Sequence, residues 1–188
     1  LFQMTWVGTP TIWYGDEIGM MGAKDPDCRR PFNWKYTEVQ KDVDLHDYYK
    51  KLISIRKTHP ALRTGTIAPL VTDGMVYGFL RNLDNENIVV ILNNDTKDIS
   101  IEVPIDMPDG PWMDKLNGKI NQLKSGKITI PLSAMSGAIL VQATDVKDIL
   151  RKTPYPASSK VEDKLISPKE VIKPAPINPM KMSKQQVK

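Results

Sequence analysis

The sequence predicts the end of an α/β unit, then an antiparallel all-β domain, then a proline-rich tail, in that order along 188 residues. A β-branched and aromatic run at 11–14, bounded by glycine and proline, indicates a buried strand. Apolar residues at three- and four-residue spacing between 44 and 59 indicate a helix. Short strand-like segments separated by turn residues between 66 and 142 indicate an all-β domain. With 40% apolar and 26% charged residues, the composition is that of a globular protein.

The first strand is expected to deliver polar groups to a site. The run 11–14 has the continuous hydrophobicity of a parallel strand that is covered on both faces. Asp16 and Glu17 follow it directly, and the long loop 18–40 then carries two neighbouring arginines. Because parallel sheets place their chemistry beyond the carboxyl ends of the strands, this loop is the candidate functional segment.

The helix that follows the loop has a start and a stop signal. Asp44 is suited to the N-cap, and the apolar periodicity begins at the next residue. His59 precedes Pro60, and a residue before proline is pushed out of helical geometry. A helix from Asp44 to His59 is therefore expected.

After Gly65 the pattern changes to short strands. Turn residues such as Asp73-Gly74 and Asn117-Gly118 separate them. Strands are expected near 66–70, 75–81, 87–93, 98–103, 112–116, 127–131 and 137–142. Strands at this spacing predict an antiparallel sandwich of about 80 residues.

The tail differs in charge and composition from the rest of the chain. Residues 151–188 hold 9 Lys/Arg against 3 Asp/Glu, a net charge of +6, which leaves 17 against 19, a net charge of −2, for residues 1–150. The basic balance thus comes from the tail and does not indicate a nucleic-acid-binding body. Residues 144–188, rich in proline and lysine, are expected to be a linker or a disordered tail, with one helical turn near 146–151.

The single cysteine, Cys28, excludes an internal disulfide and leans towards a cytoplasmic protein. No Cys/His spacing indicates a metal site, so no metal or cofactor is expected in this segment. No apolar run approaches the roughly 20 residues of a membrane span.

The segments GTPTIWYGDE at 8–17, GAKDPDCRRP at 22–31 and IRKTHPALRTG at 55–65 resemble the α-amylase family of glycoside hydrolases, family 13. They are most similar to its neopullulanase, cyclomaltodextrinase and maltogenic amylase members. The resemblance covers nearly all of residues 1–65 and continues more loosely to about 143. Trp13 stands where the family pattern leads us to expect tyrosine.

The resemblance implies a fold and an activity. Residues 1–62 would be the last strand, long loop and last helix of a (β/α)8 TIM barrel, and residues 63–143 the β-sandwich that follows it. The catalytic carboxylates of this family lie on earlier barrel strands, upstream of Leu1. The chain would thus be the C-terminal portion of a retaining hydrolase of α-1,4, or also α-1,6, glucosidic bonds in starch, maltodextrin, pullulan or cyclodextrin, and inactive alone. Its partners would be the α-glucan and the upstream barrel. Calcium in the parent enzyme is left open.

By the same resemblance, Asp25 and Arg29 would hydrogen-bond glucose hydroxyls on the non-reducing side of the cleaved bond. A carboxylate accepts from hydroxyls and a guanidinium donates to them, so the pair suits a sugar edge. The alternative is an ion pair that only stiffens the loop. Tyr14 and Trp34 are candidates to stack on a sugar ring, with core packing as the alternative for Tyr14 and for Trp13.

Asp16 and Glu17 are adjacent and would point to opposite faces of a strand, so they are not expected to converge as a catalytic pair. With Arg30 they are assigned structural roles at the barrel mouth, and Glu17 is expected to be buried and paired with an arginine. Two other functions stay open. The sandwich could be a carbohydrate-binding or interaction module, which exposed aromatic residues on one face would favour, or the chain could be a truncated remnant without function.

Overall fold

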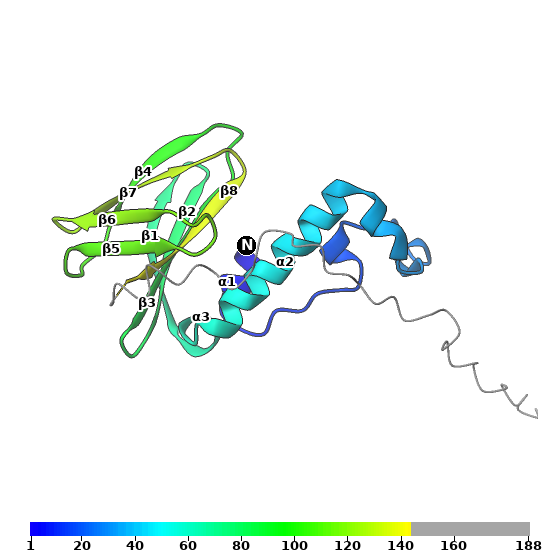
Figure 1. The fold of residues 1–188 in the computed structure, drawn as a ribbon, viewed down its shortest axis with the longest axis horizontal. Coiled ribbons are helices and arrows are strands. Elements are labelled where there is room, and N and C mark those ends of the chain that lie inside the picture. The colour runs from blue at the N-terminus through cyan, green and yellow to red at the C-terminus, as the bar shows by residue number, and fades with distance from the viewer. Residues whose placement is uncertain (144–188) are drawn as a thin grey trace, which may run out of the picture. The chain divides into compact units, whose positions relative to one another are not determined.

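The computed structural model describes residues 1–143 and places a helical segment before a β-sheet domain (Figure 1). The tail predicted at 144–188 lies outside the described residues. Six helical elements precede the first strand: α1 (Phe2–Thr5), η1 (Asp16–Ile18), η2 (Asp27–Arg29), η3 (Trp34–Glu38), α2 (Gln40–Thr58) and α3 (Ala61–Thr64).

One eight-stranded sheet follows, in which every strand pair is antiparallel. The strands are β1 (Thr66–Asp73), β2 (Val76–Leu83), β3 (Glu86–Asn93), β4 (Ile99–Pro104), β5 (Gly110–Asp114), β6 (Ile120–Lys124), β7 (Lys127–Leu132) and β8 (Ser136–Gln142). Their order across the sheet is β1-β2-β3-β8-β5-β6-β7-β4. The predicted antiparallel domain is confirmed.

Strand β6 was not predicted. Its sequence, Ile120-Asn-Gln-Leu-Lys124, is mostly polar, and only Leu123 is buried. The strand forms because β5 and β7 flank it and supply backbone hydrogen-bond partners. Pairing of this kind is set by tertiary structure and leaves little signal in the local pattern.

The main core lies between the two halves of the sheet. Trp112, Val103 and Ile128 are fully buried there, together with Val89 and Leu140. The central run of β3, Ile88-Val-Val-Ile91, is apolar at every position because both faces of this strand are covered. Successive side chains alternate between faces, so Val89 and Ile91 enter the core inside the sheet while Ile88 and Val90 face the helices.

A second core joins the helical segment to the outer face of the sheet. Leu52 and Ile55 of α2 and Leu62 of α3 belong to one buried cluster with Phe79 and Ile139 of the sheet. Fully burying a side chain of this size contributes about 1.5–3 kcal/mol, so the cluster is a substantial contact between the two segments.

Helix α2 begins earlier than its sequence predicts. It starts at Gln40, after Val39 as the N-cap, and Asp44 lies inside it, accepting a hydrogen bond from the Gln40 side chain at 2.7 Å. The predicted start of the helix was wrong because its first turn is polar and lacks apolar periodicity. The predicted end is confirmed, because α2 ends at Thr58 with His59 as its C-cap.

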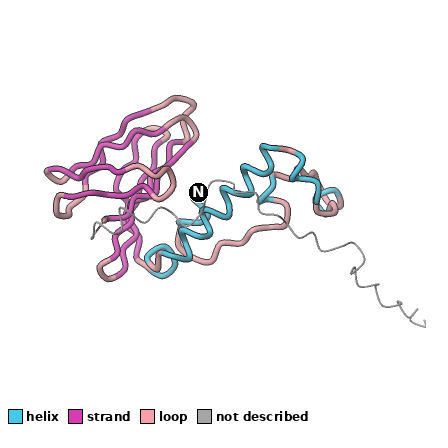
Figure 2. Tube along the Cα trace, in the orientation of Figure 1, coloured by secondary structure: helices cyan, strands magenta, loops and turns pink. Residues whose placement is uncertain are grey.

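The strand predicted at 11–14 does not form in this chain. The segment is drawn as loop in Figure 2, and no strand pair includes it. Trp13 is 60% exposed and Tyr14 is 42% exposed, so the expectation that Trp13 packs in a core is wrong for this structure. A strand needs a neighbour to take its backbone hydrogen bonds, and the described residues supply none here.

Two buried arginines tie the N-terminal segment to the rest. Arg81 of β2 is fully buried and donates to the carbonyl oxygens of Thr5 (2.6 Å), Gly65 (2.9 Å) and Thr66 (3.1 Å). Arg56 of α2 donates to four more backbone carbonyls, including that of Gly8 at 2.6 Å. Burial lowers the pKa of both guanidinium groups. Their hydrogen bonds thus attach the backbone of residues 4–8 to helix α2 and to strand β2.

Candidate substrate-binding loop

The structure brings the candidate pair Asp25 and Arg29 together. Arg29 Nε lies 3.0 Å from Asp25 Oδ1, and Arg29 Nη2 donates to Asp25 Oδ2 at 3.3 Å. Their side chains are 59% and 71% exposed, so the pair faces solvent. Asp25 precedes the short helix η2 (Asp27–Arg29) and Arg29 is its last residue, so the turn between them brings the two side chains into contact.

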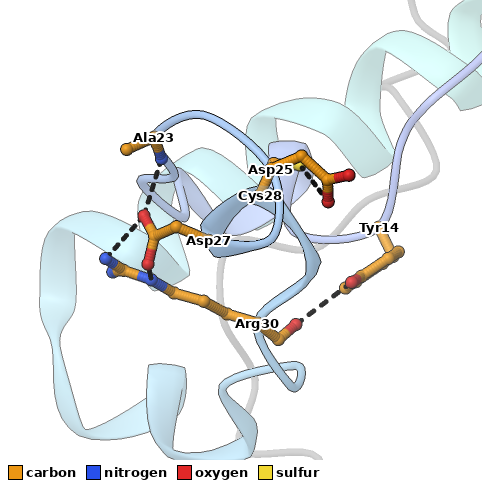
Figure 3. A network of polar contacts seen from close by, with 6 residues as sticks. All are labelled: Tyr14, Ala23, Asp25, Asp27, Cys28 and Arg30. Carbon is orange, nitrogen blue, oxygen red and sulfur yellow. Dashed lines mark hydrogen bonds and ion pairs between the residues drawn. The ribbon is translucent and has the colours of Figure 1, made fainter.

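A second pair, Asp27 and Arg30, interleaves with the first (Figure 3). Arg30 Nε donates to Asp27 Oδ1 at 2.7 Å and Arg30 Nη2 to Asp27 Oδ2 at 2.8 Å. The backbone N–H of Ala23 also donates to Asp27 Oδ2, at 2.7 Å. The hydrogen bonds from Arg30 and then Ala23 lower the pKa of the Asp27 carboxyl, and Asp27 raises the pKa of Arg30. Asp27 therefore closes the turn from residue 23 to residue 30.

Tyr14 holds this turn to the preceding segment. Its hydroxyl donates to the backbone carbonyl oxygen of Arg30 at 3.1 Å (Figure 3). Its ring lies 5.4 Å from that of Trp13, centroid to centroid. Tyr14 therefore contacts the loop through its polar end, and its half-exposed ring remains open to a ligand.

Asp16 and Glu17 accept hydrogen bonds from backbone N–H groups close to them in sequence. Asp16 Oδ2 accepts from the N–H of Trp13 at 3.1 Å, and Glu17 Oε2 accepts from the N–H of Gly15 at 2.8 Å. Gly15 has φ of 98°, a left-handed conformation that favours glycine. Glu17 is half-buried, and among the described residues it forms no ion pair with an arginine, so the expected arginine partner is not found there.

Trp34 lies in a different cluster from Asp25 and Arg29. Its ring contacts Phe32 at a centroid distance of 4.8 Å, and Phe32 also contacts Tyr36. Trp34 is 79% exposed, which suits a stacking surface. The sequence placed Tyr14 before the loop and the other three candidates within it, and the structure groups the four as an ion pair, a tyrosine tether and a separate aromatic cluster.

A hollow of about 370 Å³ lies beside this loop, between residues 12–17 and helix α2. Tyr14 and Glu17 line it together with His46, Tyr49 and Ile53. Burial, and then the charge of Lys50, lowers the pKa of His46, so the imidazole is neutral at neutral pH. Among residues 1–143, no three potential metal ligands of the His, Cys, Asp or Glu types gather.

Asp27 is expected to titrate below the usual range of an aspartate. A group with a depressed native pKa stabilises the folded loop above its unfolded pKa, and this stabilisation is lost as the pH falls through the native value. Carbon-detected NMR of the Asp27 carboxyl should show this midpoint, and Arg30→Gln should return it towards about 3.9. An unchanged midpoint in Arg30→Gln would contradict the assigned cause.

Sequence reasoning missed the structural roles of Asp27, Arg56 and Arg81. For Arg81 a signal existed, because the period of two places it on the same strand face as the apolar Tyr77 and Phe79. A charged residue at the end of such a stripe indicates a buried, hydrogen-bonded group. For Arg56 the partners are backbone carbonyls that no local pattern identifies. Asp27 pairs with the nearby Arg30 side chain, but its backbone partner Ala23 leaves no such signal.

Comparison with known proteins shows homology to the C-terminal part of glycoside hydrolases of the α-amylase family. An amylopullulanase from Thermoanaerobacter thermohydrosulfuricus is 38% identical over 157 residues, covering 77% of this chain and 10% of that protein. Neopullulanase 2 from Thermoactinomyces vulgaris is 38% identical over 144 residues, 74% of this chain and 24% of that protein. Cyclomaltodextrinases are among the other relatives. The chain therefore spans a quarter or less of these two proteins.

A solved structure of an α-amylase from Anoxybacillus matches the fold with a TM-score of 0.69 and 30% identity, covering 77% of this chain and 31% of that one. No protein-family model matches the chain. No helix in the part of the chain that the structure describes combines the length and the apolar character needed to cross a bilayer.

Proposed function

We propose that residues 1–143 form the C-terminal part of a retaining α-glucan hydrolase that cleaves α-1,4 glucosidic bonds, or also α-1,6 bonds. The names of the relatives, amylopullulanase, neopullulanase and cyclomaltodextrinase, support an α-glucan substrate. In this proposal the chain supplies a substrate-binding loop and a supporting β-domain. The catalytic carboxylates belong to a preceding barrel of the same polypeptide.

The exposed Asp25–Arg29 pair carries this proposal. A carboxylate that accepts and a guanidinium that donates, 3.0 Å apart, match two neighbouring hydroxyl groups of a glucose ring. Both side chains face solvent, so a sugar can reach them without a rearrangement of the core. The exposed rings of Tyr14 and Trp34 offer further apolar faces on which a sugar could stack.

The unpaired segment before the loop supports the barrel assignment for residues 1–62. Residues 9–13 are loop, Tyr14 is in a turn, and none of them has a strand partner among the described residues, while Val7, Trp13 and Tyr14 are exposed. Exposed large apolar side chains next to unpaired backbone are typical of a surface that another part of a protein covers. In the proposal, the preceding barrel strands cover it.

The alternative of a carbohydrate-binding module receives no support from the described sandwich. Its three aromatic residues lie in or beside the cores, with Phe79 and Trp112 fully buried and Tyr77 packed next to Phe79. Its exposed large apolar side chains are Met75, Ile120 and Met135. These side chains lack the flat ring that stacks on a sugar.

A chimera tests the proposal directly. In it, residues 1–143 replace the aligned part of neopullulanase 2, and the hydrolysis of pullulan is measured. Asp25→Ala and Arg29→Ala should each raise KM about ten- to hundredfold, because each removes a hydrogen bond between a charged group and a sugar hydroxyl.

Asp47→Ala is the matched control, since Asp47 forms an exposed ion pair with Lys50 on helix α2, at 3.4 Å. It should leave KM unchanged. If Asp25→Ala and Arg29→Ala also leave KM unchanged in an active chimera, the pair does not bind substrate and this assignment of the loop is wrong.

A further inference from the structure

Asp27 and Arg30 connect three separate points of the backbone. The Asp27 carboxylate accepts from the N–H of Ala23 and from two nitrogens of Arg30. The carbonyl of Arg30 accepts from the hydroxyl of Tyr14. The turn is thus held by three contacts: Ala23 to Asp27, Asp27 to Arg30, and Arg30 to Tyr14 in the preceding segment (Figure 3).

The Asp25–Arg29 pair has no comparable support of its own. Besides each other, the one side-chain contact of either residue in the described structure is the Cys28 thiol, 3.9 Å from Asp25 Oδ1 (Figure 3). An exposed ion pair by itself contributes about 0–1 kcal/mol and does not hold two side chains in one direction. The direction in which this pair points therefore depends on the backbone of η2 between the two residues.

We propose that Asp27, Arg30 and Tyr14 are positioning residues, which hold η2 so that Asp25 and Arg29 face an α-glucan. This inference rests on the proposed function and extends it to residues that touch no substrate through their polar groups. Each ion pair joins one residue of η2 to one residue just outside it, Arg29 to Asp25 and Asp27 to Arg30. The Asp27–Arg30 pair thus braces the turn through side chains that the exposed Asp25–Arg29 pair does not use. Arginine suits position 30 because its planar fork spans both carboxylate oxygens, which the single ammonium group of lysine cannot.

Binding a sugar through an ordered pair costs less entropy than binding it through a mobile one. Loss of the support should therefore weaken substrate binding and leave the chemical step unaffected. The hydrogen bonds from Arg30 and Ala23 lower the pKa of Asp27, so its carboxylate stays ionised to a lower pH than that of an ordinary aspartate.

The first measurement uses the 188-residue chain. Backbone ¹⁵N relaxation should give order parameters of about 0.85 for residues 25–29 in the wild type and below about 0.6 in Asp27→Ala and Arg30→Gln. Tyr14→Phe should show a smaller decrease, because it removes one hydrogen bond. Asp47→Ala, which breaks an ion pair of the same spacing on helix α2, should show none.

The second measurement uses the chimera. Arg30→Gln should raise KM for pullulan about three- to tenfold, with kcat within about twofold of the wild type. The KM of Arg30→Lys should lie between those of the wild type and Arg30→Gln. In an Arg29→Ala background, Arg30→Gln should add nothing, because a positioning residue acts only through the pair that it positions.

The outcomes separate the two proposals. Residues 25–29 that stay ordered in Asp27→Ala and Arg30→Gln, or KM effects of Arg30→Gln and Arg29→Ala that add, would overturn the positioning role. If η2 loses its order in Asp27→Ala and Arg30→Gln while neither Asp25→Ala nor Arg29→Ala changes KM, the positioning role holds. In that case the assignment of Asp25 and Arg29 to substrate binding is wrong. The relaxation result decides the positioning role even if the chimera is inactive.

Discussion

Arg81→Met is expected to destabilise the chain by about 3–5 kcal/mol, a large share of the stability of an ordinary domain. Methionine fills a similar volume but donates no hydrogen bonds. The carbonyl oxygens of Thr5 and Gly65 would each lose a donor in a buried region, and that of Thr66 would lose a part-buried one. Relief of the desolvated charge offsets part of this cost, since burial already lowers the pKa of Arg81. Equilibrium unfolding in urea measures the difference.

Arg63→Met is the matched control for this prediction. Arg63 also donates only to backbone carbonyls, those of Arg56 and Lys57, but its side chain is exposed. Water replaces its hydrogen bonds, so the expected cost is about 0–1 kcal/mol. Equal losses for the two variants would show that the burial of Arg81 does not decide its contribution.

The 188-residue chain by itself is expected to release no reducing sugar from pullulan, maltodextrin or cyclodextrin above the blank. Retaining hydrolysis needs two carboxyl groups about 5 Å apart, one of which has a raised pKa. Asp16 and Glu17 each accept from a backbone N–H, and Asp25 and Asp27 are paired with arginines. The pKa of Asp27 is shifted downwards, opposite to the shift that a general acid requires.

The chimera with neopullulanase 2 is the positive control for this assay, because it contains a complete barrel under the proposed function. Turnover by the isolated chain that disappears in Asp25→Ala would place catalysis in the loop and overturn the proposed division of roles. Turnover that persists in Asp25→Ala and Arg29→Ala would indicate a contaminating hydrolase.

The candidate loop shows which contacts can be predicted from the local sequence and which cannot. The resemblance to the α-amylase family singled out Asp25 and Arg29, and the turn between them brings the two side chains into contact. Arg30 was expected to be structural, but the sequence did not identify Asp27 as its partner. Arg30 closes the turn because Ala23 and Tyr14 also reach this point, and Tyr14 is sixteen residues away from Arg30 in sequence.

The sequence by itself determined the antiparallel domain and the end of helix α2, because alternation, turn residues and the His59-Pro60 stop act between near neighbours. Tertiary structure alone decided that residues 120–124 become a strand and residues 11–14 do not, and it decided the positions of Arg56 and Arg81. Each of these depends on hydrogen-bond partners outside the segment itself. Strand β6 finds them in β5 and β7, whereas residues 9–14 find none among the described residues, and that difference decides which segment becomes a strand.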